Sequence, residues 1–193
     1  MDQTMIIHDN WLFISTMKCA TNSLYAALPG ARCGRGFHPR PPKQTRIRPL
    51  QWTVVRNPYD RAVSIWASTC LRDGDRYKAK ARIKSVGGDL DSFDDFVAAC
   101  LANGYRWAGG HAWLFRNQAD WLDGIVIDCY ARFEELYADV AGIIGEVVSF
   151  PRENQSKHAP WARYYARSNT HEIVGRWAGS DWSLPVAEFW EEP

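Results

Sequence analysis

The stretch WLFISTMKCATNSL, residues 11–24, decides how the rest of the chain is interpreted. It begins with four apolar residues, 11–14, whose aromatic and β-branched side chains are typical of a buried strand. Small, polar and cationic residues follow, and an apolar run over 24–28 then indicates a helix that ends at Pro29-Gly30. The stretch therefore predicts a strand, a polar loop that carries one lysine, and the start of a helix.

A loop of this kind can bind anions, because the first N–H groups of a helix lack partners within the helix and the helix dipole is positive there. Lys18 adds a full positive charge, and the hydroxyl groups of Thr21 and Ser23 add hydrogen-bond donors. The Walker A pattern GxxxxGK[ST] is absent, since the lysine precedes the small residues and does not follow glycines. A buried strand followed by an ordinary capped helix is the alternative, and this stretch alone does not exclude it.

A second strand is predicted over 51–55, and it leads into the sequence RNPYDR at 56–61. Asn57-Pro58 is a turn signal, and proline fits the first turn of a helix that is predicted to run to about Leu71. Arg56 is thereby expected at the carboxyl end of a strand, which is where open α/β sheets bind ligands. Ser64 lies about two turns into the predicted helix.

Residues 31–48, between the two motifs, contain six basic residues, His38 and no acidic residue. Three prolines in this segment forbid a helix, so an extended basic loop is expected. Such a loop is either solvated or faces an anionic ligand.

The composition places the chain among ordinary globular proteins. A length of 193 residues fits one domain, 1–193, with a sizeable core. The net charge of +1 excludes a global field for a polyanion such as nucleic acid, so any electrostatic function has to be local. The ten tryptophans favour either aromatic packing or a groove that faces sugars.

The cysteines and the apolar runs indicate a cytoplasmic protein. Five widely spaced cysteines without a CxxC pair argue against a disulfide framework or a zinc site and fit a reducing compartment. No signal peptide or transmembrane segment is expected, because the N-terminus is not basic and the apolar runs are short.

Apolar periodicity along the chain predicts alternating strands and helices. Strands are expected at 5–7, as a sheet edge, and at 11–14, 51–55, 125–130 and 147–150. Helices are expected at 24–28, 58–71, 93–101, 111–121, 133–144 and 170–177. This order predicts an α/β protein in three layers, with a mostly parallel central sheet flanked by helices.

With both motifs in this order, the chain resembles the carbohydrate sulfotransferases that use 3′-phosphoadenosine 5′-phosphosulfate (PAPS), whose fold is related to that of P-loop NTPases. In those families the first motif binds the 5′-phosphosulfate and the second binds the 3′-phosphate. The second motif, VVRNPYDRAVSIW at 54–66, is the more specific match. Weaker similarities are FEEL at 133–136, the polar pair Asn154 and Ser156, and the aromatic–acid pattern at 177–181.

The resemblance implies a role for residues that occupy the motif positions. Those implied to line the 5′-phosphosulfate are Lys18, Ala20, Thr21, Asn22 and Ser23, and Asn22 departs from the hydroxyl residue usual there. Arg56 and Ser64 are implied to hold the 3′-phosphate, and the arginine fork suits a phosphate independently of any family. Lys157 and Arg163 are candidates for closing over the nucleotide. For Arg61, a surface ion pair with Asp60 is the expectation.

Sulfuryl transfer resembles phosphoryl transfer, so positioning and charge stabilisation are expected to dominate catalysis. Lys18 would neutralise the leaving 5′-phosphate oxygen, and no metal is expected. His38 is the predicted general base, because some members of these families have a catalytic histidine in this interval and imidazole titrates near neutrality. His158 is the alternative base, and if neither histidine serves, a carboxylate has to. The expected acceptor is a carbohydrate or glycolipid hydroxyl, and the expected product nucleotide is 3′-phosphoadenosine 5′-phosphate (PAP).

Two other functions stay open at this point. The first is a small-molecule kinase with an atypical phosphate loop, which needs a magnesium-holding acid, and Asp128 is the one strand-end candidate. The second is a non-catalytic module on the same fold that binds a nucleotide or an acidic glycan.

Overall fold

The computed structural model describes residues 5–8, 10–28, 32–34, 49–71, 91–102, 116–146, 149–150, 158–166 and 169–193. Contacts divide the chain into two compact units. The first comprises Met1–Arg56 with Leu122–Gln155, and the second comprises Asn57–Trp121 with Ser156–Pro193. The expected single domain stays a prediction.

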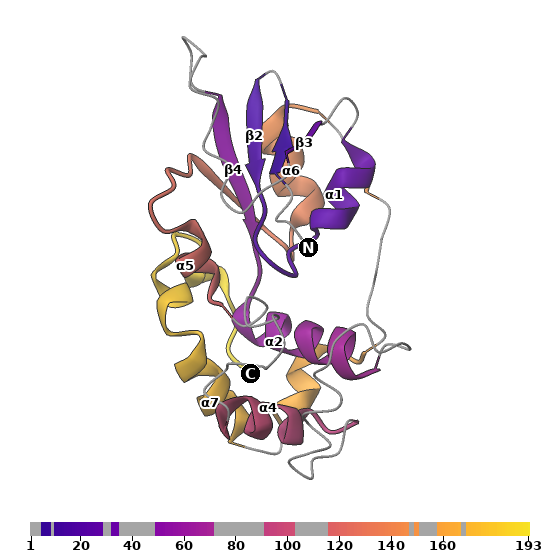
Figure 1. The fold of residues 1–193 in the computed structure, drawn as a ribbon, viewed down its shortest axis with the longest axis vertical. Helices are drawn as coiled ribbons and strands as arrows, with labels where there is room; N and C mark the ends of the chain where they lie inside the picture. Colours follow the sequence, from indigo (N-terminus) through magenta and orange to yellow (C-terminus); the bar gives the residue numbers. More distant parts are fainter. Residues whose placement is uncertain are drawn as a thin grey trace. The chain divides into compact units, whose positions relative to one another are not determined.

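The first unit is built on an open sheet of five strands in the order β3-β1-β2-β4-β5, part of which is labelled in Figure 1. The strands are β1 (Met5–Ile7), β2 (Trp11–Ile14), β3 (Arg32–Gly34), β4 (Leu50–Val55) and β5 (Cys129–Arg132). β2, β4 and β5 pair in parallel, whereas β1 is antiparallel to both of its neighbours, β2 and β3. Four of the five strands therefore run in one direction, which confirms an α/β protein with a mostly parallel sheet.

The predicted strand at 5–7 is present, but its expected place at the edge of the sheet is wrong. Arg32–Gly34 adds β3 outside it, within the segment that was expected to be an extended loop. Three residues without an apolar run give no periodic signal, so the pairing with the main chain of β1 could not be recognised from the sequence.

The strand predicted at 125–130 begins four residues later and ends two residues later, as β5. The Ile125 N–H donates to the Leu122 carbonyl at 2.9 Å in a turn, and Val126 is exposed. The ladder with β4 pairs Trp52 with Cys129 and Val55 with Arg132. The apolar run at 125–127 is therefore the approach to the strand and not the strand itself.

One face of the sheet carries the hydrophobic core of the first unit. Phe13 pairs with Trp52 and Trp52 with Cys129, and because side chains alternate along a strand, Ala131 shares their face. Helices α1 (Thr21–Ala27) and α6 (Leu136–Ile144) contribute to the same cluster. Its buried members are Ile6, Trp11, Phe13, Cys19, Leu24, Leu28, Trp52, Val54, Ala131, Leu136, Val140 and Phe150.

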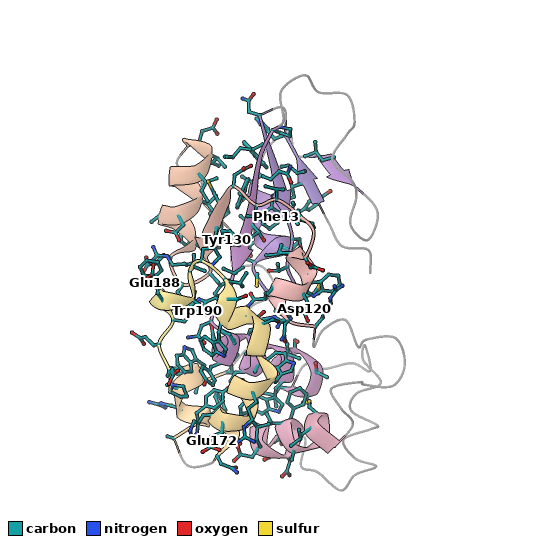
Figure 2. The ribbon with its side chains drawn as sticks, turned by 90° about the vertical axis from the view of Figure 1, so that its left-hand side faces the viewer. Phe13, Asp120, Tyr130, Glu172, Glu188 and Trp190 are labelled. Atoms are coloured by element: carbon teal, nitrogen blue, oxygen red, sulfur yellow. The ribbon has the colours of Figure 1, made fainter. Side chains whose placement is uncertain are left out.

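Figure 2 locates Phe13 on β2 and Tyr130 on β5, which by the same alternation belong to opposite faces of the sheet. Among the described residues of this unit, α1 and α6 share the Phe13 face. A second helical layer, and with it the three-layer arrangement, stays a prediction.

The second unit is helical (Figure 1). Its elements are α2 (Pro58–Trp66), η1 (Ala67–Leu71), α4 (Phe93–Ala102), α5 (Gln118–Leu122), η3 (Trp161–Tyr164), α7 (Thr170–Trp177), η4 (Gly179–Ser183) and η5 (Ala187–Phe189). The last residue of α5, Leu122, already belongs to the first unit. The helix predicted at 170–177 is confirmed residue for residue. None of the helices in the described ranges is long and apolar enough to cross a membrane.

α2 begins where the sequence predicts. The Asn57 side chain accepts a hydrogen bond from the Tyr59 N–H at 2.9 Å, and Pro58 occupies the first turn. All nine residues of the helix are buried. The predicted extension to Leu71 is also present, but its last five residues form a π-helix, η1.

Arg61 corrects an expectation, because it lies inside the second unit and not at the surface. Its side chain is fully buried, and its Nη1 lies 3.9 Å from Oδ2 of the equally buried Asp181. Its Nη2 donates to the Arg116 carbonyl at 2.6 Å, and its guanidinium carbon lies 5.4 Å from the centre of a Trp177 ring. The aromatic–acid pattern at 177–181 therefore contributes partners to this arginine, and the expected surface location was wrong.

Several tryptophans serve aromatic packing in the second unit. Tyr59 lies 6.0 Å from Trp161 in a stacked geometry and 5.8 Å from Trp182. Trp182 in turn meets Trp190 edge-on at 5.8 Å. The high tryptophan count is thus explained in part by the interior of this unit.

Candidate functional site

The candidate site lies where β2 and β4 end side by side. The last paired residues are Ile14 and Thr53, and threonine side chains continue the pairing beyond them. The Thr53 hydroxyl donates to the Ile14 carbonyl at 2.6 Å, and the Thr16 hydroxyl donates to the Val54 carbonyl at 2.7 Å. Both threonines are fully buried, so the loop that leaves β2 is fixed to the end of β4.

The loop adopts an unusual backbone conformation. Lys18 has a φ of 67° and Ala20 a φ of 57°, and among the described residues these are the only non-glycine residues with positive φ. The left-handed region costs a residue with a Cβ roughly 1–2 kcal/mol. Strain of this kind clusters at ligand-binding sites, and successive N–H groups in such turns can form a concave site for an anion.

Contacts within the loop hold its two ends together. The Ser15 and Thr21 hydroxyl oxygens lie 2.8 Å apart, and the Thr21 hydroxyl also lies 3.4 Å from the Thr16 carbonyl oxygen. α1 then begins at Thr21, three residues earlier than predicted, with Ala20 as its N-cap. Ser15 and Thr16 were not singled out from the sequence, although hydroxyl residues at a strand end are the available signal.

The predicted residues of the first motif differ in exposure. Lys18, Ala20 and Thr21 are half-buried, Ser23 is buried, and Asn22 is exposed. Their contact with a 5′-phosphosulfate stays a prediction.

Arg56 joins the two motifs. Its Nη1 donates to the Lys18 carbonyl at 3.2 Å, which links residues 38 positions apart in the chain. Its side chain is only 7% exposed, and its guanidinium carbon lies 4.0 Å from the centre of the Phe133 ring. The sequence motifs predicted to bind one nucleotide therefore meet, through Lys18 and Arg56, at one end of the parallel strands.

The turn after β5 supports Arg56 and was not recognised from the sequence. The Phe133 N–H donates to the Val55 carbonyl at 2.8 Å, directly before Arg56. The backbone N–H, Nε and Nη2 of Arg132 donate to the Asp139 carboxylate at 2.8, 2.9 and 2.9 Å. The side-chain hydrogen bonds from Arg132 lower the pKa of Asp139, although partial burial opposes the shift. The available signal was FEEL at 133–136, whose first residue is Phe133.

Ser64, the second predicted 3′-phosphate ligand, belongs to the other unit. It is buried in α2, whereas Arg56 is the last residue of the first unit on this side of the boundary. The predicted sharing of one phosphate by Arg56 and Ser64 stays a prediction.

The alternative base and one of the two predicted closing residues also lie in the second unit. Nδ1 of His158 lies 2.8 Å from the Ala159 carbonyl oxygen, and the ring lies 6.5 Å from Tyr164. Arg163 is exposed on η3. His38 and Lys157, together with Asn154 and Ser156, lie outside the described residues.

Asp128 does not satisfy the requirement of the kinase alternative. β5 begins at Cys129, so Asp128 precedes the strand and lies at the opposite end of the parallel sheet from Arg56. Its carboxylate accepts a hydrogen bond from the Gln51 N–H at 2.8 Å. The expectation of an acid at the carboxyl end of a strand was therefore wrong for this residue, because the strand had been placed four residues too early.

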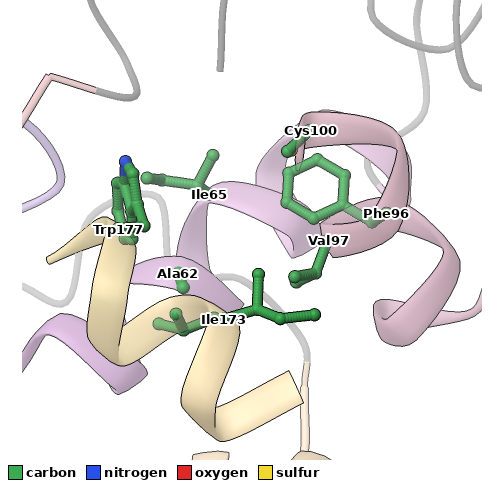
Figure 3. A pocket seen from close by; sticks show the side chains of 8 residues that line it. Ala62, Ile65, Phe96, Val97, Cys100, Ile173 and Trp177 are labelled. Carbon is green, nitrogen blue, oxygen red and sulfur yellow. The ribbon is translucent and has the colours of Figure 1, made fainter. Parts of the chain in front are cut away.

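A separate apolar cavity lies inside the second unit, between α2, α4 and α7 (Figure 3). Its volume of about 20 Å³ has room for roughly one water molecule, and its lining is apolar. Ile65, Phe96 and Ile173 are among the residues around it. It is far too small for a nucleotide, and its lining offers no polar group to bind one.

Compared with protein-family models, with curated proteins and with solved structures, the chain gives no match. In the described part of the chain, no group of three or more His, Cys, Asp or Glu side chains is arranged to hold a metal ion.

Proposed function

We propose that the protein is a PAPS-dependent sulfotransferase of the P-loop-like sulfotransferase fold, and that it transfers a sulfuryl group to a carbohydrate or glycolipid hydroxyl. The observation that carries the proposal is the hydrogen bond from Arg56 to the carbonyl of Lys18 in a loop of left-handed conformation. This contact supports a site for an anionic nucleotide, because it holds a loop that carries one lysine against a buried arginine.

The charges at this site support an anionic ligand. Arg56 is buried and offers a planar fork of donors, which suits a phosphate better than a lysine does. The Lys18 side chain, half-buried, supplies a second cation on the neighbouring loop. A strained loop that contains no glycine also argues for a conformation retained for a ligand.

The proposed reaction is an in-line displacement at sulfur. The acceptor hydroxyl oxygen forms a bond to sulfur while the bond between sulfur and the 5′-phosphate oxygen breaks. Lys18 stabilises the negative charge that develops on the leaving oxygen, and a base takes the hydroxyl proton. The products are a sulfate ester and PAP. His38 remains the proposed base and His158 the alternative.

Incubation with ³⁵S-labelled PAPS and a panel of neutral and acidic glycans tests the proposal. Transfer of label is expected, and Lys18→Ala should reduce it by about 10²–10³-fold while PAP binding changes far less. Transfer of ³²P from γ-labelled ATP in place of ³⁵S would establish the kinase alternative. PAP binding without transfer to any acceptor would indicate that the protein is a non-catalytic nucleotide-binding module.

The base is tested by substituting each histidine in turn. His38→Asn should lower turnover by about 10²–10⁴-fold and leave PAP affinity close to that of the wild type. If His158→Asn loses the activity and His38→Asn keeps it, the role belongs to His158. If both keep it, a carboxylate is the base.

A further inference from the structure

We infer that Phe133 is a positioning residue, whose ring fixes the plane of the Arg56 guanidinium so that its edge is directed at an anion. The identity of that anion, the 3′-phosphate of PAP, rests on the proposed function. The contact itself does not, because it is a property of the unliganded first unit.

The strand register explains why these two residues meet. Val54 pairs with Ala131 and Val55 with Arg132 in the parallel ladder. Arg56 and Phe133 are the next residues after the ends of these two strands. By the alternation of side chains they share the face of Val54 and Ala131. The guanidinium carbon of Arg56 accordingly lies 4.0 Å from the ring centre.

The Phe133 ring is itself held in place. The N–H of Phe133 donates to the carbonyl of Val55, and the Glu135 N–H donates to the Arg132 carbonyl at 3.2 Å. Arg132 is in turn held by three hydrogen bonds to Asp139 in the first turn of α6. These bonds hold the backbone of the turn, and the Phe133 side chain packs against the core cluster of the first unit.

Stacking on a ring orients an arginine without using its donors. All the N–H groups of a guanidinium lie in its plane, so hydrogen bonds to a carbonyl or a phosphate form at the edge. The guanidinium carbon of Arg56 lies over the ring of Phe133, while Nη1 donates to the Lys18 carbonyl. Because Arg56 is buried, its attraction to the ring is expected to be stronger than that of a solvent-exposed cation–π pair.

Calorimetric titration with PAP and with adenosine 5′-phosphate, which lacks the 3′-phosphate, tests this role. Phe133→Leu should weaken PAP binding by about 3- to 30-fold and adenosine 5′-phosphate binding by less than about twofold. Phe133→Tyr keeps the ring face and should keep the selectivity. Pentafluorophenylalanine at position 133 keeps the shape but reverses the ring quadrupole, so it should behave like Phe133→Leu.

Phe13→Leu is the matched control. Phe13 is buried in the core cluster of the same unit and packs on Trp52, with ring centres 4.7 Å apart. This substitution should lower the melting temperature without changing the ratio of the two affinities. If Phe133→Leu also lowers only the melting temperature, or weakens both nucleotides equally, Phe133 is structural and the inference is wrong.

A ligand-free measurement separates this inference from the proposed function. The Nε–H order parameter of Arg56 from ¹⁵N relaxation should be high in the wild type and in Phe133→Tyr and should fall in Phe133→Leu. If the wild type does not bind PAP but this pattern holds, the proposed function fails and the positioning role stands. If Arg56 is equally ordered in Phe133→Leu, the positioning role fails whatever the nucleotide results are.

Discussion

Lys18 and Ala20 show that two residues with side chains adopt the left-handed conformation in a loop where the sequence has no glycine. Glycine is the usual signal for such a conformation, because it has no Cβ to clash with the backbone. The loop could therefore be predicted from its polar composition and its lysine, but its backbone path could not. The cost of the conformation belongs to the folded state, and local sequence patterns do not report it.

The strain at Ala20 gives a prediction about stability. Ala20→Gly should raise the free energy of unfolding by up to about 1 kcal/mol, since relief of the Cβ clash outweighs the greater entropy of the unfolded chain. Ala20→Val should lower it by about 2 kcal/mol, because a β-branched residue fits the left-handed region worst. Urea denaturation measures both changes.

Ala26→Val is the control for the Ala20 pair. Ala26 is exposed in α1, where valine costs only its lower helix propensity, about 0.6 kcal/mol. Equal losses for Ala20→Val and Ala26→Val would show that the left-handed conformation at Ala20 is not present in solution.

Arg56 and Arg61 come from one motif but have different surroundings. Arg56 contacts a ring and a carbonyl at the end of the sheet, whereas Arg61 is enclosed by Asp181, the Arg116 carbonyl and Trp177. The sequence identified Arg56 as the candidate ligand residue from its strand-end position. It could not identify the partners of Arg61, since Asp181 is 120 positions away and no local pattern connects them.

At the scale of elements, capping signals were the most reliable guide. Asn57-Pro58 marks the start of α2, and α4 begins at Phe93 as predicted, where the Ser92 hydroxyl accepts the Asp95 N–H at 3.2 Å. These signals act over three or four residues, so they are complete in the local sequence. The start of β5 was misplaced because it depends on pairing with β4, which is distant in the sequence.

Two helical glycines give a matched test of helix packing. A Cβ on Gly142 in α6 would meet nothing within 4 Å, so Gly142→Ala should stabilise the protein by up to about 1 kcal/mol. A Cβ on Gly175 in α7 would lie 3.0 Å from the Tyr59 hydroxyl oxygen, so Gly175→Ala should bring no gain or a loss. Thermal unfolding measures both variants.

Tyr59→Phe provides the control, because it removes the hydroxyl that the new methyl group would meet. The double variant Gly175→Ala/Tyr59→Phe should be more stable than the two separate effects predict. Additive effects would contradict the close approach of α7 to α2 at this point.

Asp139 and Asp181 should respond to pH in opposite directions. The pKa of Asp139 is lowered by hydrogen bonds from Arg132, so its contribution to stability is present above its unfolded pKa of 3.8 and is lost as the pH falls through the folded value. The pKa of Asp181 is raised by burial, against the opposing effect of Arg61, so its contribution is present below 3.8 and is lost as the pH rises through the folded value.

Asparagine variants make this difference measurable. Relative to the wild type, Asp139→Asn should be least stable near neutrality, and its deficit should shrink as the pH is lowered towards 3.8 and below. Asp181→Asn should gain relative to the wild type as the pH rises above 3.8. Urea denaturation at several pH values tests the pair, and parallel pH profiles would refute the assignment of the two shifts.

At the scale of the whole molecule, the sequence predicted the α/β class and the convergence of two motifs at the strand ends. It did not predict β3 or the support of Arg56 by the turn after β5, because both arise from pairing between distant strands. It also did not predict the division of contacts into two compact units. The catalytic role of His38 and the 3′-phosphate-binding role of Ser64 remain predictions of the proposed function.

The most direct test is a comparison of nucleotides by calorimetry and thermal shift, with the wild type and Arg56→Met. PAP should bind the wild type about 10- to 100-fold more tightly than adenosine 5′-phosphate, since a charge-assisted bond to a buried arginine is worth about 1.5–3 kcal/mol. Arg56→Met should lose that advantage, while Arg176→Met, at an arginine whose side chain is 81% exposed, should keep it. Stabilisation by ATP with magnesium but not by PAP, or an unchanged preference in Arg56→Met, would contradict a PAPS site at Lys18 and Arg56.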